Sequence, residues 1–171
     1  MRQPGDWAVL GAVAEQPRHG FGVAQLLSPD GALGQVWAMP RPLVYQALKR
    51  LLADGMVEEV RVEAGTRGPR RTVLAATPAG KRALRAWLAE PVLHVRDARS
   101  QLLLKLALAS RAGRDQRALL QAQRRLLSDQ VGALERQHAT EGGFERTLTL
   151  WRLESSRAAL RFVGELLAGG R

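Results

Sequence analysis

Cysteine is absent from the 171 residues of the chain. Without cysteine the protein can form no disulfide framework, thiolate zinc site, iron–sulfur cluster or cysteine nucleophile. The three histidines, His19, His94 and His138, are not spaced as metal ligands on one helix face, so we expect no metal and no cofactor. The most apolar run, residues 102–109, is interrupted by Lys105 and is far shorter than the ~20 residues of a membrane span.

Recognisable catalytic motifs are also absent. Gly80-Lys81 resembles part of a phosphate-binding loop, but Ala75 stands where that loop needs an earlier glycine, and Arg82 stands where it needs a hydroxyl. No serine lies in a G-x-S-x-G motif, and no glycine fingerprint opens a helix after a strand. We therefore predict that the chain is not an enzyme.

Acidic residues are outnumbered by basic ones, with 16 Asp plus Glu against 26 Lys plus Arg, which gives a net charge of +10. Lysine and arginine contacts to phosphate supply most non-specific affinity for nucleic acid, so the excess favours a nucleic-acid partner. The alternative is a solvated basic surface. Net charge does not distinguish the two, so the argument rests on local clusters of basic residues. The polar start, residues 1–6, contains no apolar signal segment, so we expect a cytoplasmic protein.

The first part of the chain predicts three helices. Apolar residues recur at helical spacing in three segments, residues 7–15, 21–27 and 43–52. Proline or glycine separates these segments and prevents one helix from running into the next. The connection that contains Gly34 and Trp37 is interpreted as a loop.

A β-hairpin and a fourth helix follow. Valines alternate with charged residues over 59–63, and the alternation resumes after a loop at 65–69, which predicts two strands. Thr77 followed by Pro78 is a helix-start signal. Three helices, a basic hairpin and another helix are the order of a winged helix-turn-helix domain, which we assign to residues 1–90.

Residues 91–171 have helical patterns throughout and are predicted to form a helical dimerisation domain, so the fold class is mainly α. The last helix, after Gly142-Gly143, carries two apolar stripes. We expect one stripe to pack within the chain and the other to form a homodimer, because two exposed stripes would be too apolar for a monomer. A monomeric bundle that buries both stripes is the alternative. The stripe assigned to the dimer contains Phe144, Leu148, Trp151, Phe162 and Leu166.

Four elements in the first 90 residues resemble, in order and spacing, the PadR family of bacterial transcriptional regulators. They are Pro17-Arg18-His19-Gly20-Phe21, then Val44-Tyr45-Gln46-Ala47-Leu48-Lys49-Arg50-Leu51 with Asp54-Gly55-Met56-Val57, then Gly68-Pro69-Arg70-Arg71, and Thr77-Pro78-Ala79-Gly80. The helical tail resembles that of the longer-tailed PadR subfamily, whose tail helices dimerise. The resemblance implies a DNA-binding regulator, and PadR-like proteins commonly sense aromatic or drug-like compounds.

A winged helix places its third helix in the major groove of double-stranded DNA. Arg41, Gln46 and Lys49 are predicted to contact base edges, because an amide pairs with adenine and a cationic group with guanine. Phosphate contacts are predicted for Tyr45 and Arg50, with a half-buried packing role for Tyr45 as the alternative. The predicted DNA-binding set is Arg41, Pro42, Tyr45, Gln46, Lys49 and Arg50 on the helix and Arg67, Arg70 and Arg71 on the wing.

Two recognition helices about one DNA turn apart, roughly 34 Å, would read an inverted-repeat operator, and we expect repression as the output. Trp87 and Trp151 are the candidates to line a cleft for a small aromatic or drug-like effector, and two core tryptophans that bind nothing are the alternative. A MarR-like winged-helix regulator and a winged-helix protein-interaction module without DNA binding are the alternative functions.

Overall fold

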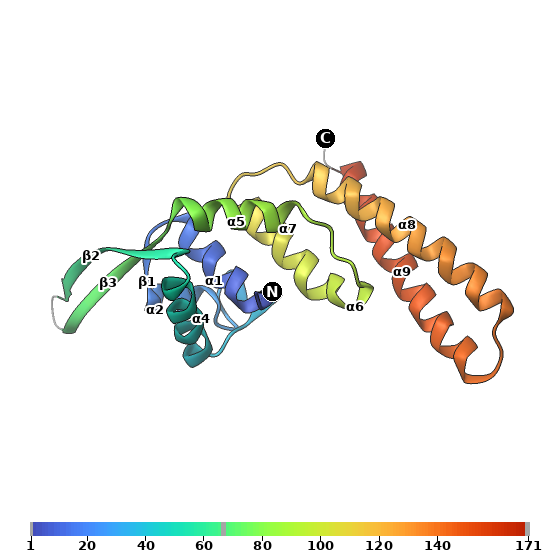
Figure 1. Ribbon diagram of the computed structural model, residues 1–171, viewed down its shortest axis with the longest axis horizontal. Helices are drawn as coiled ribbons and strands as arrows, with labels where there is room; N and C mark the ends of the chain where they lie inside the picture. The colour runs from blue at the N-terminus through green and yellow to red at the C-terminus, as the bar shows by residue number, and fades with distance from the viewer. Residues whose placement is uncertain (1, 66–67, 170–171) are drawn as a thin grey trace. The chain divides into compact units, whose positions relative to one another are not determined.

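The computed structural model describes residues 2–65 and 68–169. They form two compact units, whose elements are labelled in Figure 1. The first unit contains the chain up to Leu88 together with Leu103–Arg114, and the second contains Ala89–Leu102 and the chain from Asp115 onward. The sequence-based division at residue 90 differs from this in one main respect, because the segment around Leu103–Arg114 packs with the first unit.

The first unit is built around α1 (Pro4–Glu15). This helix packs against α2 (Gly20–Leu26), α4 (Arg41–Ala53) and α7 (Leu103–Arg111). Its fully buried apolar residues are Ala8, Val9, Leu10, Ala12 and Val13. The helix begins before the predicted residue 7, because proline fits the first helical turn, where its missing N–H costs no hydrogen bond.

One short helix, α3 (Gly34–Trp37), lies where the sequence was interpreted as a loop. A Cβ on Gly34 would lie 1.7 Å from the carbonyl oxygen of Ser28, so only glycine fits this position. Glycine has a low helix propensity, and four residues show no apolar period. The local sequence therefore contained no helix signal here.

The wing is the predicted antiparallel hairpin of β2 (Val57–Gly65) and β3 (Gly68–Ala76). A third strand, β1 (Arg18–His19), pairs with the free edge of β3, so the sheet order is β1-β3-β2. Two residues are too few for an alternating pattern, and the sequence did not predict this strand. The strand ties the start of α2 to the base of the wing.

The predicted start of α5 (Pro78–Ala89) is confirmed in detail. The Thr77 hydroxyl accepts a hydrogen bond from the Gly80 amide at 3.0 Å and donates one to the Gly55 carbonyl at 2.8 Å. A Cβ on Gly80 would lie 2.1 Å from the carbonyl oxygen of Met56. The Thr-Pro-Ala-Gly segment thus caps α5 and holds it close to the turn that ends α4.

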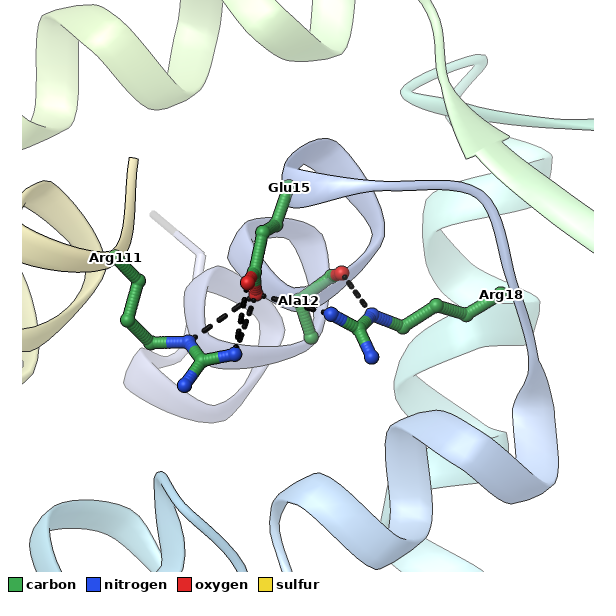
Figure 2. A network of polar contacts seen from close by, with 4 residues as sticks. All are labelled: Ala12, Glu15, Arg18 and Arg111. Carbon is green, nitrogen blue, oxygen red and sulfur yellow. Dashed lines mark hydrogen bonds and ion pairs between the residues drawn. The ribbon is translucent and has the colours of Figure 1, made fainter. Parts of the chain in front are cut away.

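A network of polar contacts joins α1, β1 and α7 (Figure 2). Glu15 at the end of α1 accepts hydrogen bonds from Arg111 at 2.8 and 3.1 Å, and it forms an ion pair with Arg18 at 3.1 Å. Arg18 Nε also donates to the Ala12 carbonyl at 3.0 Å. That carbonyl belongs to the last turn of α1, where helical acceptors lack an intrahelical partner.

A buried lysine lies in the core of the first unit. Lys105 Nζ donates to the Trp87 carbonyl at 2.6 Å and lies 4.6 Å from the centroid of the Trp87 ring. Trp87 itself stacks on Trp7, with ring centroids 5.1 Å apart. The carbonyl and the ring face both stabilise the ammonium, which explains a lysine inside the most apolar run of the sequence.

The second unit contains α6 (Val95–Asp97), a π-helical turn (Ala98–Leu102), α8 (Arg117–Thr140) and α9 (Gly143–Gly169). The two long helices pack on each other, and α6 packs on α9. Residues 95–111, part of the region predicted to be helical throughout, are thus divided into α6, the π-helical turn and α7. Within the described residues, none of the helices has the length and apolar character needed to cross a bilayer.

Gln123 on α8 holds the segment that follows α5. Its side-chain oxygen accepts a hydrogen bond from the Val92 amide at 2.7 Å, and its side-chain nitrogen donates to the Val92 carbonyl at 3.0 Å. Both residues are buried. The amide therefore satisfies two backbone groups that would otherwise be buried without partners.

Candidate nucleic-acid interface

The predicted amphipathic pattern of α4 is observed. Val44, Ala47, Leu48 and Leu51 are buried in the core of the first unit. The other side of the helix is open to solvent and carries Arg41, Pro42, Tyr45, Gln46 and Lys49. A proline in the first turn begins the helix, as for α1. Five of the predicted DNA contacts therefore share one exposed surface, which we call the α4 face.

Arg50 is placed differently. Its Nη2 and Nε donate to one oxygen of Asp6 at 2.6 and 3.2 Å. Asp6 lies in the first turn of α1 and is only 5% exposed. The guanidinium of Arg50 therefore compensates a buried carboxylate, and this contact gives the residue a structural role in addition to the predicted phosphate contact.

Two of the three predicted wing arginines, Arg70 and Arg71, belong to β3. Arg71 is exposed and faces Glu63 of β2 across the hairpin. Arg70 is part of β3, and Arg67 lies outside the described residues. An open cleft of about 620 Å³ separates the α4 face from the sheet, and Lys49 and Arg71 line it from opposite sides. The geometry thus brings the helix and the basic strand to one cleft.

Polar contacts fix the wing to β1. Glu63 accepts a hydrogen bond from Arg61 Nε at 2.7 Å and lies 2.9 Å from His19 Nε2, while His19 Nδ1 lies 3.2 Å from the Thr72 carbonyl oxygen. The hydrogen bond from Arg61, supported by the one from His19, lowers the pKa of Glu63. Both neighbours of the imidazole are acceptors, so both contacts are hydrogen bonds only when both ring nitrogens carry protons.

One aromatic residue at this surface was not predicted. Phe21, the second residue of α2, is 43% exposed, and the guanidinium carbon of Arg41 lies 5.1 Å from the centroid of its ring. Tyr45 is equally exposed, and the centroid of its ring lies 5.8 Å from the same guanidinium carbon. The sequence analysis placed Phe21 in an apolar helix pattern and in the first PadR-like motif without giving it a role at the DNA, and an aromatic residue next to a glycine was the signal that could have identified it.

The apolar stripe predicted to form a dimer is exposed on α9. Phe144 and Trp151 are 75% and 72% exposed, and Leu148, Phe162 and Leu166 are also open to solvent. We call these five residues the α9 stripe. The buried residues of α9 form a separate row on another side of the helix and are Thr149, Leu153, Ser156 and Val163. The expected division of α9 into an inward and an outward apolar side is observed.

The two tryptophans predicted to line an effector cleft lie in different units. Trp87 is buried in the core of the first unit against Trp7. Trp151 lines an open groove of about 810 Å³ within the second unit, together with Leu134 and Leu148. Three arginines also line this groove, Arg96, Arg99 and Arg152. Nearby, Ser156 contributes a buried hydroxyl that makes no hydrogen bond to the described residues.

The helices α2 and α4, the three-stranded sheet and the packed α1 and α5 define the first unit as a winged helix-turn-helix domain. Residues 9–86 match the family model of the transcriptional regulator PadR-like family. This segment is therefore PadR-like, as its motifs predicted, and the chain is a transcriptional regulator. The match favours the PadR family over the MarR-like alternative.

Solved structures with similar folds cover almost the whole chain at low sequence identity. Bacillus subtilis PadR in complex with operator DNA is 18% identical, with 95% of this chain and 96% of that chain covered and a TM-score of 0.49. For the same protein in complex with p-coumaric acid the values are 18%, 97%, 98% and 0.45. The protein smu.1604c from Streptococcus mutans UA159 is 17% identical, with 96% and 98% covered and a TM-score of 0.45. No curated protein matches the sequence.

Proposed function

We propose that this chain is a homodimeric, non-enzymatic repressor that acts in the cytoplasm and binds an inverted-repeat operator through the α4 face. The observation that carries the proposal is the α4 face itself, in which polar and basic side chains on the recognition helix of a PadR-like winged helix are exposed beside a basic wing strand. A protein-interaction module would need neither the basic helix nor the basic strand.

The α4 face contains the chemistry for reading bases. Gln46 can donate to and accept from adenine, and Lys49 and Arg41 can donate to guanine. The wing arginines Arg67, Arg70 and Arg71 would contact the phosphate backbone or a neighbouring minor groove, and such contacts orient the domain without specifying sequence. In this proposal α4 reads the DNA sequence, and the wing orients the domain on the DNA.

The α9 stripe supports a second copy of this chain as the dimer partner. Five large apolar residues in one row would remain in water in a monomer, and a two-fold axis would bury the same row on both subunits. A dimer presents two α4 faces, and helices about one DNA turn apart, roughly 34 Å, match the half-sites of an inverted repeat.

Selection of binding sites from random duplex DNA tests this function. The full-length protein is mixed with a library of random duplexes at ~150 mM salt, and bound DNA is amplified and sequenced over several rounds. We expect one enriched inverted repeat whose half-site centres are about 10 base pairs apart. A library that stays random after selection would refute sequence-specific DNA binding.

Arg71→Ala is expected to weaken binding about equally for the enriched duplex and for a scrambled one, because the wing contacts phosphate. The slope of log affinity against log salt concentration should decrease in magnitude by about one unit. Fluorescence anisotropy at several salt concentrations measures both quantities. Arg82→Ala on α5 is the control, since it removes an exposed arginine outside the wing and should leave the slope unchanged. A change in preference at one base pair only would contradict the phosphate assignment.

The groove of the second unit supports a small effector as the signal that releases DNA. An aromatic surface at Trp151 and the three arginines around it suit a planar apolar molecule with a negative charge. Leu148 and Trp151 belong to both the groove and the α9 stripe, so a ligand here would favour one arrangement of the two subunits. Tryptophan fluorescence that stays flat across a panel of aromatic carboxylates would contradict this proposal.

A further inference from the structure

Arg41, the first residue of α4, lies against two aromatic rings. Its guanidinium carbon is 5.1 Å from the centroid of the Phe21 ring on α2 and 5.8 Å from that of the Tyr45 ring, one turn further along α4. The face of an aromatic ring attracts a guanidinium electrostatically. Two rings from two helices therefore restrict the directions in which this side chain can point.

The Tyr45 ring is itself held in place by α2. A Cβ on Gly20 would lie 2.9 Å from Tyr45 Cε1 and 3.2 Å from Leu48 Cδ1. Glycine at this position therefore lets the ring approach the first residue of α2, beside a buried leucine of the core. Packing therefore fixes the Tyr45 ring. The position of Arg41 then depends on its other aromatic contact, Phe21.

The contacts with the two rings leave the hydrogen-bonding groups of Arg41 available. The guanidinium donates through N–H groups in its own plane, and a cation–π contact does not require any of them to meet an acceptor. Within the described residues, Arg41 forms no ion pair with a carboxylate, in contrast to Arg50. An oriented fork of donors at the start of a recognition helix suits the O6 and N7 acceptors of guanine, the commonest specific contact to a base.

We propose that Phe21 is a positioning residue that determines specificity, because it holds Arg41 in the orientation that reads one guanine in each half-site. The inference rests on the proposed binding of DNA by the α4 face, and it adds a residue outside that face to the reading of sequence. Phe21 acts through Arg41 and needs no contact of its own with DNA. Its loss should therefore alter discrimination at a single position of the operator.

The test uses the full-length protein and the duplex enriched by selection. Each guanine of a half-site is replaced in turn by 7-deazaguanine, which lacks the N7 acceptor, and affinity is measured by fluorescence anisotropy. The wild-type protein should lose about tenfold in affinity at one guanine, within the range of a bidentate base contact. Arg41→Ala should remove that sensitivity and leave the response to the other guanines unchanged.

Phe21→Leu keeps an apolar side chain but removes the ring. We expect the sensitivity at the Arg41-dependent guanine to fall about two- to fivefold, which corresponds to one exposed cation–π contact. Added to Arg41→Ala, the same substitution should cause no further change, since the two residues act as one unit. Phe21→Tyr keeps a ring face and should restore the wild-type sensitivity. Thermal unfolding of each variant checks that the fold is retained.

The outcomes separate this inference from the function on which it rests. Full sensitivity in Phe21→Leu, or an equal loss on the enriched and the scrambled duplex, would overturn the role of Phe21 while DNA binding by the α4 face still stands. The absence of any Arg41-dependent guanine would overturn it as well. A wild-type protein that enriches no sequence would refute the proposed function, and the role of Phe21 with it.

Discussion

Leu148→Glu combined with Trp151→Glu is expected to convert the protein from a dimer into a monomer of 18.7 kDa. Both residues belong to the exposed α9 stripe, and four charges would face one another across a two-fold interface without partners. Sedimentation equilibrium measures the mass directly. In the monomer only one α4 face can engage an inverted repeat, so affinity for the enriched duplex should fall by at least about a hundredfold, towards the non-specific level.

Leu150→Glu is the matched control for this prediction. Leu150 is an exposed leucine on the same helix and receives the same change of charge, but it lies off the α9 stripe. The control should remain dimeric and keep its affinity for the operator. A double variant that stays dimeric would contradict the assignment of the stripe, and equal dissociation of the control would show that added charge alone disrupts the dimer.

Arg50→Met is expected to lower the free energy of unfolding by about 3 kcal/mol, because it leaves the carboxylate of Asp6 buried without its cation. The expected loss lies at the low end for a broken buried pair, since the Arg50 side chain is 47% exposed and water can reach this side. Urea denaturation measures it, with an unchanged m-value as the sign that only stability has changed.

The double variant Asp6→Leu with Arg50→Met separates the two roles of Arg50. Removing the carboxylate as well should recover most of the lost stability, because the pair is then replaced by apolar side chains of similar size. If Arg50→Met instead unfolds like the wild type and binds all duplexes more weakly, the residue is a phosphate contact and its pair with Asp6 contributes little.

Local patterns predicted the elements that determine the domain class. The apolar stripe of α4, the alternation in the wing and the capping pair at Thr77 and Pro78 are each encoded within a few residues, and all three are observed. The split of α9 into two apolar sides also follows from helical periodicity alone. These features depend on spacing along the chain, and spacing is what a single sequence shows.

Features that depend on pairing across the fold could not be predicted. Asp6 and Arg50 are 44 positions apart, and β1 is a strand only because it meets the edge of β3. The contact of the Arg41 guanidinium with both Phe21 and Tyr45 depends on the packing of α2 on α4. Trp87 likewise follows a helical pattern whichever surface it packs on, and its stacking on Trp7 depends on tertiary contacts.

Sequence reading by the α4 face is tested by the ratio of two affinities of the wild-type protein at ~150 mM salt. One is for the duplex enriched by selection, and the other is for a duplex of the same length and composition with scrambled sequence. We expect a ratio of about a thousandfold or more, with two subunits bound to each enriched duplex. Equal affinities for the two duplexes would mean that the positive charge forms only a basic surface and that the α4 face does not read sequence.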